Sequence, residues 1–533
     1  MKVLLLVRSD ADDTPTARCP YVLRANRDAL MIAARRGHTS IVRLLLGLQQ
    51  NAPPADSCRG QALMEAARCG HEAVVQLLLS RQKHAAHADC QRGRALILAA
   101  MGGHEGVVQL LLGWPEHAAR ADCEDSEALL CAVRSGHTGS ARLLLGWQEH
   151  AAHADCRHGQ ALVDAAYGGH SDIVQLLLSR HDAPRADCQE GQALVEAARG
   201  GHEAVVLLLL SLRRCAPRAD CQQGQALIEA ARGGQSGIIN MLLSQRPAHT
   251  RPRVNCQEGR ALIEAARGGH RDIVQRLLGT PEPHNALRAD AQNSRALVVA
   301  AGRGDARMVE MLLGWPEHAP RADCQNGQAL VEAAGHGHAG MVGFLLNRQH
   351  DSPRADCQGG DALVEAAAGG HMGIVQLLLG RQPDAPRPDC REGGALVVAA
   401  GRGDARMVEM LLGWPEHAPR ANCQNGQALV EAAGHGHAGM VEFLLNRQHD
   451  APRADCQGGE ALVAAVVGGH LAMVELLLGW PEHAPCGSCQ AGRALILAED
   501  DERWDLVSLL RDHARCQACM REGRRVRSEG WIG

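Results

Sequence analysis

Cysteine and histidine are the residues of this sequence most able to do chemistry. The chain has 533 residues, of which 20 are cysteine and 28 are histidine. Thiolates and imidazoles can together hold a zinc ion, and a thiolate beside an imidazole can act as a nucleophile. Twelve of the cysteines, which we call the cysteine ladder, recur at a nearly constant interval: Cys90, Cys123, Cys156, Cys188, Cys221, Cys256, Cys324, Cys357, Cys390, Cys423, Cys456 and Cys489.

Two Cys-x-x-Cys pairs lie towards the end of the sequence, at Cys486 and Cys489 and at Cys516 and Cys519. Two such pairs are a recognised signal for zinc binding. The interval from Cys489 to Cys516 is longer than usual for such a site, and Cys489 already belongs to the cysteine ladder. A zinc site and a coincidence of spacing therefore both stay open. The coincidence is favoured, so we expect no bound metal and no cofactor.

A repeating unit explains this regular spacing. Its reference position is the leucine of "QALVEAARGGH" (residues 192–202), and the corresponding leucines are Leu30, Leu63, Leu96, Leu129, Leu162, Leu194, Leu227, Leu262, Leu297, Leu330, Leu363, Leu396, Leu429, Leu462 and Leu495. The step from Leu162 to Leu194 is one residue shorter than the common interval, and the two steps from Leu227 to Leu297 are each two residues longer. A period of about 33 residues over fifteen copies predicts a solenoid, in which each unit contacts only its neighbours.

Each copy predicts two short helices. In the copy around Leu194, Ala197 and Ala198 continue a narrow apolar stripe at helical spacing. Gly201 ends this stretch, and residues 205–210 form a second, wider apolar stripe before a loop that contains proline. A single helix pair could not bury both stripes, whereas a stack of pairs can. The predicted fold is therefore all-α, with stacked antiparallel helix pairs.

The residues of this copy resemble those of the ankyrin repeat family, whose unit is a turn followed by two antiparallel helices. The matching residues are Asp187, Leu194, Ala197, Ala198, Gly201, His202, Val206, Leu208 and Leu209. The resemblance runs from about residue 22 to residue 513 and implies an ankyrin-type solenoid with extended turn loops. Residues 1–21 would then be a truncated half-repeat that caps the array, and residues 514–533 a basic, unstructured tail.

The turn between repeats departs from the family pattern. The family's Thr-Pro-Leu-His helix start is replaced by residues 192–195, "QALV". The missing threonine cap and proline should weaken each helix start by about 1 kcal/mol. The turn glycine, Gly191, also lies one place later than is usual, which leaves the turn geometry open. The resemblance further implies that the histidine of the Gly-His position, here His202, bonds to the backbone between repeats.

The cysteine ladder has the wrong spacing for disulfides or shared metal ions. Stacked helices lie about 8–10 Å apart. A disulfide requires α-carbons about 4.4–6.8 Å apart, and a shared zinc ion requires sulfur atoms about 2.3 Å from one metal. The ladder is therefore predicted to fill space between repeats as small side chains, rather than to carry redox or metal chemistry.

The resemblance places a binding surface on the concave face, which is lined by the turns and the first helices. Glutamates lie three residues before Arg199, Arg232 and Arg267 and can pair with them. We expect the other arginines near the Gly-His turns to lack such partners. The candidate binding residues are Arg35, Arg36, Arg68, Arg134, Cys188, Gln189, Arg199, Gly200, Arg232, Arg267, Arg303 and Arg402.

Composition and motifs argue against several classes of function. The net charge of −5 does not indicate a nucleic acid or an acidic membrane as a partner. No apolar run approaches the roughly 20 residues of a membrane helix. Neither of the two lysines stands in a phosphate-binding loop, and there is no GxSxG or HExxH motif. We expect a protein without catalytic residues, located in the cytoplasm, with the nucleus as the alternative.

The predicted function is a non-catalytic scaffold that binds a protein partner along the concave face. The alternatives are a substrate-recruiting adaptor, for instance of a ubiquitin ligase, and a nucleic-acid binder that uses the arginines. Two features complicate the first reading. The "CQ" of the turn hardly varies between copies, although a binding face should vary. Tryptophans recur in the loops after the second helix, at Trp114, Trp315, Trp414 and Trp480, and could form a second contact surface.

Overall fold

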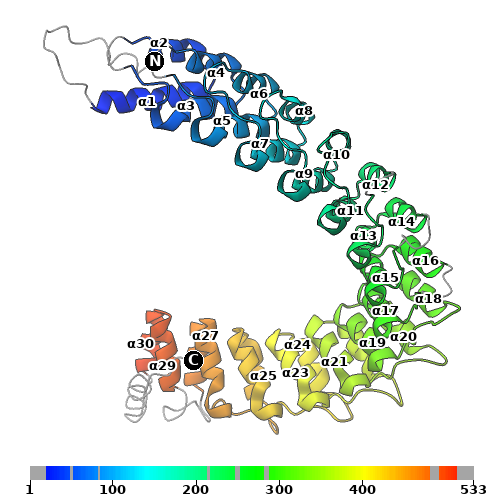
Figure 1. The fold of residues 1–533 in the computed structure, drawn as a ribbon. Helices are drawn as coiled ribbons and strands as arrows, with labels where there is room; N and C mark the ends of the chain where they lie inside the picture. The colour runs from blue at the N-terminus through cyan, green and yellow to red at the C-terminus, as the bar shows by residue number, and fades with distance from the viewer. Residues whose placement is uncertain are drawn as a thin grey trace, which may run out of the picture. The chain divides into compact units, whose positions relative to one another are not determined.

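The computed structural model describes residues 20–48, 52–81, 85–212, 216–245, 252–280, 287–480 and 491–512 (Figure 1). Within these residues the regular structure is entirely helical, and no strand occurs. The contacts divide the chain into two units, Met1–Gln257 and Glu258–Gly533. Most of the predicted cap, the tail after residue 512, and the four cysteines of the two Cys-x-x-Cys pairs lie outside the described residues. The last two residues of the predicted cap belong to the first helix.

The helices of the first unit come in consecutive pairs. They are α1 (Pro20–Arg35), α2 (Thr39–Leu46), α3 (Ser57–Arg68), α4 (Glu72–Leu79), α5 (Cys90–Met101), α6 (Glu105–Leu112), α7 (Cys123–Arg134), α8 (Thr138–Gly146), α9 (Cys156–Tyr167), α10 (Ser171–Leu178), α11 (Cys188–Gly200), α12 (Glu203–Leu210), α13 (Cys221–Arg232) and α14 (Ser236–Leu243).

The second unit continues the same pattern, and its first helix begins two residues before the boundary. The helices are α15 (Cys256–Gly268), α16 (Arg271–Leu278), α17 (Ala291–Gly302), α18 (Ala306–Leu313), α19 (Cys324–Gly335), α20 (Ala339–Leu346), α21 (Cys357–Gly369), α22 (Met372–Leu379), α23 (Cys390–Gly401), α24 (Ala405–Leu412), α25 (Cys423–Gly434), α26 (Ala438–Leu445), the short 3₁₀-helix η3 (Cys456–Gly458), α27 (Glu460–Gly468), α28 (Leu471–Leu478), α29 (Ala491–Asp500) and α30 (Trp504–Asp512).

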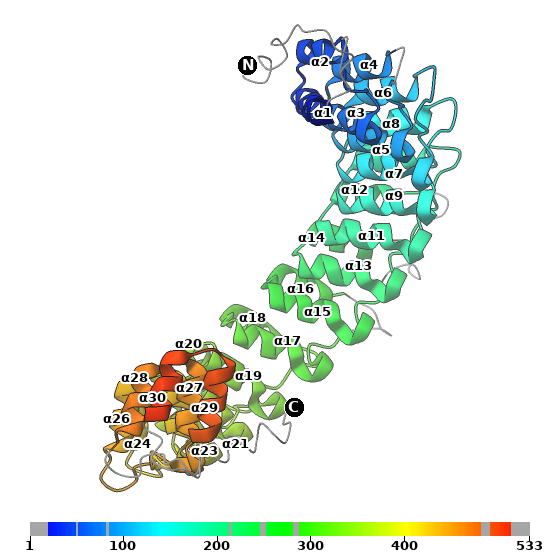
Figure 2. The same ribbon diagram turned by 90° about the vertical axis from the view of Figure 1, so that its left-hand side faces the viewer.

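Each unit has two layers of helices. The odd-numbered helices pack against one another in a first-helix layer, and the even-numbered helices form a second-helix layer behind them, as Figures 1 and 2 show for each unit. The core lies between the layers. Leu194, Ala197 and Ala198 of α11 and Val206 and Leu209 of α12 are fully buried. The small alanines allow first helices to approach closely, while the valines and leucines fill the space behind, as the sequence predicted.

The turn that opens each first helix from α3 to α25 has a left-handed backbone that the sequence did not indicate. Before α11 becomes right-handed, Gln189, Glu190 and Gly191 have φ values of 48°, 57° and 78°. The amide of Gly191 donates to the carbonyl of Asp187 at 3.1 Å and closes this turn. A left-handed conformation costs a residue with a Cβ about 1–2 kcal/mol, so contacts with the neighbouring repeats must stabilise it.

The histidine at the Gly-His position bonds to the repeat before it, as the family resemblance implied. Nε2 of His202 lies 3.0 Å from the carbonyl oxygen of Tyr167, and Nε2 of His137 lies 3.0 Å from that of Met101. A carbonyl oxygen can only accept, so Nε2 carries the proton in both contacts. The same contact recurs in both units, for example from His338 to Gly302 at 3.0 Å.

Two glycines of one repeat should respond in opposite ways to substitution by alanine. Gly327 has a φ of +82°, and a Cβ there would lie 2.6 Å from Sγ of Cys357. Gly343, within α20, has a right-handed backbone and nothing within 4 Å of an added Cβ. We expect Gly327→Ala to lower the free energy of unfolding by more than about 1 kcal/mol, because backbone and neighbour must both shift. Gly343→Ala should raise it by about 0.5–1 kcal/mol.

The measurement is urea unfolding of the full chain, followed by circular dichroism in the far ultraviolet. Because the two substitutions add the same methyl group to the same repeat, they control for each other. Equal destabilisation by both would contradict the proposed contact between the turn glycine and the next cysteine.

Candidate functional site

One side-chain row of the first-helix layer contains half of the candidate binding residues. Each member lies five residues after the reference leucine, in the last turn of an odd-numbered helix or directly at its end. In the first unit this first-helix row is Arg35, Arg68, Met101, Arg134, Tyr167, Arg199 and Arg232. In the second unit it is Arg267, Gly302, Gly335, Ala368, Gly401, Gly434, Val467 and Asp500. Arginines and large apolar side chains therefore concentrate in the first unit, while glycine is the commonest residue of the row in the second.

Carboxylates neutralise the arginines in the middle of the row. Arg199 pairs with Glu196 at 3.0 Å in its own helix and with Glu229 of the next first helix at 3.3 Å. Arg232 also contacts Glu229, at 3.1 Å. Burial acts to raise the pKa of Glu229, but the hydrogen bonds from Arg199 and Gln225 outweigh it, so the pKa lies below its ordinary value. In the second unit Arg267 pairs with Glu264 at 2.8 Å, so all three sequence-predicted pairs are present.

The expectation that Arg68 and Arg134 lack partners is wrong. Arg68 pairs with Glu65 at 2.9 Å, which is the same three-residue spacing as in the predicted pairs. Arg134 pairs with Asp164 of the next first helix at 2.8 Å and approaches Glu127 at 3.7 Å. The partner Asp164 could not be found from helical spacing, because it belongs to another repeat and becomes a neighbour only through stacking.

Four other candidate arginines are exposed and make no ion pair within the described residues: Arg35, Arg36, Arg303 and Arg402. Two of these have a packing role. A Cβ on Gly269 would lie 2.9 Å from Nη2 of Arg303, and Gly370 is covered in the same way by Arg402. In both repeats aspartate replaces the usual histidine two residues later, and the guanidinium occupies the space that the imidazole fills elsewhere.

The turn candidates connect successive repeats. The side chain of Gln189 donates to the carbonyl oxygen of His158 and to Oε1 of Gln160, each at 3.3 Å. Sγ of Cys188 lies 4.0 Å from the carbonyl oxygen of Gly159. Gly200 is exposed but lies against the ring of His202. These contacts explain why "CQ" hardly varies between copies, since both residues hold one turn on the next.

The described cysteines are free thiols, and those of the ladder are buried or half-buried. Burial, assisted by Asp220, raises the pKa of Cys221 to about 12. Burial and Asp89 together raise the pKa of Cys90 to about 11. A thiol with so high a pKa holds its proton at neutral pH and is a poor nucleophile and a poor metal ligand. The ladder therefore fills space between repeats, as the sequence predicted. Its described cysteines offer no activated thiolate.

Sequence reasoning missed the most exposed apolar residues of the first-helix row. The side chains of Met101 and Tyr167 are 43% and 64% exposed, and they flank Arg134 in consecutive first helices. Val467, in the second unit, is 53% exposed. The available signal was that large apolar residues replace the arginine or glycine found at this place in most copies. The carbonyl groups of Met101 and Tyr167 are held by the histidines described above, so the backbone under both side chains is fixed.

The four tryptophans that the sequence suggested as a second contact surface are not fully exposed. Trp114, Trp315, Trp414 and Trp480 are each half-buried. In the first unit, Trp114 lines a shallow surface hollow together with Pro115, Arg142 and Trp147. Their partial burial leaves less apolar surface for a partner than fully exposed rings would offer.

The stacked helix pairs and the first-helix row that recurs along them define the chain as a helical repeat protein. A family model described as ankyrin repeats (3 copies) matches residues 2–91, 162–253, 227–325, 297–389 and 396–488. The chain therefore belongs to the ankyrin repeat family, whose repeats generally mediate contacts between proteins. Residues 92–161 fall between the matched segments, yet α6 to α8 continue the same pairing there. No curated protein matches the chain. None of the described helices is long and apolar enough to cross a membrane.

Thiol alkylation should distinguish the ladder from Cys58, whose side chain is exposed. In the native chain at mildly alkaline pH, we expect N-ethylmaleimide to modify Cys58 at least tenfold faster than Cys221, because burial keeps the Cys221 thiol protonated. Peptide mapping by mass spectrometry measures both rates in one sample, and the same reaction in concentrated urea should remove the difference. Equal rates in the native chain would refute the buried ladder.

Alkaline pH should weaken the fold through the ladder. The pKa of Cys221 is raised by burial from an ordinary value of 9.0 to about 12 in the folded chain. Below pH 9 the thiol keeps its proton in both states, and its full contribution to stability is present. As the pH rises from 9 to about 12, the unfolded chain loses the proton first, and stability falls. Cys221→Ala should therefore reduce the drop in the urea midpoint between pH 8 and pH 10.5, whereas Cys58→Ala should not.

Proposed function

We propose that the chain is a non-catalytic scaffold that binds a protein partner through the first-helix row of the first unit. The observation that carries this proposal is the pair of exposed apolar residues, Met101 and Tyr167, on either side of Arg134. A methionine and a tyrosine are common anchors of protein interfaces, and the arginine between them is held in place by Asp164. The histidines that hold the carbonyls of Met101 and Tyr167 keep the entropic cost of binding low.

The spacing of these residues indicates the shape of the partner segment. Successive first helices lie about 8–10 Å apart, so Met101 and Tyr167 are separated by roughly 16–20 Å. An extended peptide rises about 3.3 Å per residue. A segment of about six residues, with an apolar residue at each end, would fit the two exposed apolar side chains.

Nucleic-acid binding is less well supported by the same row. The affinity of such proteins comes mainly from cations that are free to neutralise phosphates. Here Arg68, Arg134, Arg199, Arg232 and Arg267 all have carboxylate partners. A phosphate backbone would have to displace these carboxylates. An apolar side chain of a protein partner that packs on Tyr167 would not.

Tyr167→Ala should weaken partner binding at least tenfold, because it removes an aromatic anchor from the centre of the proposed interface. The measurement starts with affinity purification of the tagged full-length chain from nuclease-treated lysate under reducing conditions. The affinity of the stoichiometric partner is then measured with purified proteins for the native chain and for the variant.

Leu207→Ala is the matched control, because Leu207 is also an exposed apolar residue, at 61%, but lies on α12 in the second-helix layer. It should leave the affinity unchanged. A partner that binds equally well to the native chain and to the Tyr167→Ala variant would exclude the proposed row. Recovery of nuclease-sensitive material alone would favour the nucleic-acid alternative.

A further inference from the structure

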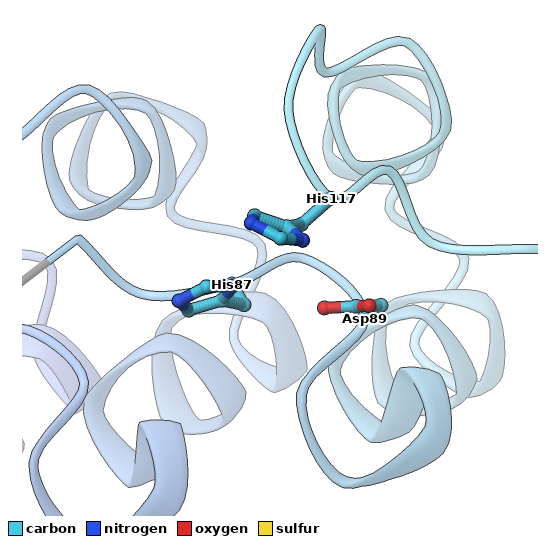
Figure 3. Close-up of side chains that lie close together, drawn as sticks. All are labelled: His87, Asp89 and His117. Atoms are coloured by element: carbon cyan, nitrogen blue, oxygen red, sulfur yellow. The ribbon is translucent and has the colours of Figure 1, made fainter.

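A cluster of two imidazoles and a carboxylate lies on the loops that precede first helices. His87 and Asp89 precede α5, and His117 lies in the loop before α7 (Figure 3). All three side chains are exposed, and each offers a ligand atom within 4.8 Å of the others. The centroids of the two rings lie 4.2 Å apart, and the ring planes are tilted by 52°. Among the described residues, this is the only group of three or more such side chains close enough to share a metal ion.

Backbone hydrogen bonds fix the loops that carry these three residues. The amide of Asp89 donates to the carbonyl oxygen of His117 at 3.2 Å, which joins the two loops directly. The amide of Cys90 donates to the carbonyl oxygen of His87 at 3.1 Å and closes the turn at the start of α5. The relative position of the three side chains is therefore set by the stacking of two successive repeats rather than by flexible chain.

Other repeats show what normally occupies this place. The residue two positions before the turn aspartate is usually an arginine, which donates two hydrogen bonds to the carboxylate of that aspartate. Arg120 donates to Asp122 at 2.9 and 2.8 Å, and Arg185 donates to Asp187 at 2.9 and 2.9 Å. At His87 this cation is replaced by an imidazole. The carboxylate of Asp89 thereby loses the usual ion pair, and no described residue bonds to it instead.

The next two repeats along the chain each lack one residue of this two-histidine, one-aspartate set. Around Asp122 the loop histidine, His150, is present, but the partner residue is Arg120, which cannot bind a metal ion. Around Asp155 the partner residue is His153, but the loop position holds Asp182 instead of histidine. The carboxylate of Asp182 is used to accept from the amide of Ala154 at 2.9 Å.

We propose that His87, Asp89 and His117 bind a Zn²⁺ ion that joins the two loops. Imidazole nitrogens with one carboxylate form a ligand set that suits zinc, whereas calcium and magnesium prefer oxygen ligands only. Zinc–nitrogen bonds are about 2.0–2.1 Å long, so small side-chain rotations bring the three ligand atoms onto one ion. Sequence spacing did not reveal this site, because its ligands come from two repeats and lie outside the conserved Gly-His position.

The test compares Zn²⁺ binding by the native full-length chain and by the His87→Arg variant. Arginine is the residue that neighbouring repeats carry at this place, so the variant keeps the fold and restores an ion pair with Asp89. Calorimetric titration with Zn²⁺, under reducing conditions, is expected to show one bound equivalent fewer in the variant. His153→Arg makes the same substitution in a repeat that lacks the loop histidine and should leave the count unchanged. Equal counts for the native chain and His87→Arg would overturn the proposal.

Two further measurements separate this site from zinc bound by cysteines elsewhere in the chain. Zn²⁺ should protect His117 from diethyl pyrocarbonate in the native chain but not in the His87→Arg variant, as mapped by mass spectrometry. Arg120→His should create the same ligand set with Asp122 and His150 and raise the count by one. Failure of Zn²⁺ to protect His117 would refute the site, and an unchanged count in Arg120→His would show that these residue types at this spacing do not suffice.

Discussion

The fold depends on the close approach of successive repeats at two backbone points with left-handed geometry. At the first, the thiol of Cys221 lies on Gly191, where a Cβ would come within 2.9 Å of the sulfur. At the second, the imidazole of His202 lies on Gly169, whose φ is +71°. Glycine occupies both points in most repeats, while serine takes the first point at Ser126 and Ser294, with φ values of 63° and 67°. These contacts set the distance between repeats, and the hydrogen bonds of the turn and of the histidine form only at that distance.

The repeats that lack the histidine show that a side chain must fill the gap over the glycine of the preceding repeat, and that this side chain need not be an imidazole. Gln235 places its side-chain amide over Gly201, with Nε2 2.5 Å from the position of a Cβ. Arg303 covers Gly269 with its guanidinium although it lies two residues earlier in the repeat. Arg503 takes the histidine position in the last repeat and donates to the carbonyl oxygen of Val466 at 2.7 Å. In each case a long polar side chain fills the same gap, so the stack tolerates a change of chemistry but not a loss of volume.

The sequence predicted those features that a single repeat determines by itself. The period, the two apolar stripes and the Gly-His contact all follow from patterns within one repeat. The left-handed turn does not, because nothing in the local propensities of Gln189 and Glu190 favours it. Contacts with the adjacent repeats stabilise it. The partner of Arg134 escaped prediction for the same reason, since Asp164 becomes its neighbour only after stacking. Tyr167 was missed because the interpretation of that face followed charge and not exposed apolar area.

Stacking also determines where function can be located. The cysteine, the glutamine and the histidine of each repeat are committed to contacts between repeats, and they hardly vary. The end of the first helix differs, because its carbonyl is held by the next histidine, as at Met101 and Tyr167, while its residue type varies between repeats. This position holds methionine, arginine or tyrosine in the first unit and most often glycine in the second. The residue two positions before the turn aspartate varies as well, since it is arginine in most repeats but histidine at His87 and His153. A fixed backbone whose side chain varies between repeats suits a binding site, and in this chain these two positions supply it.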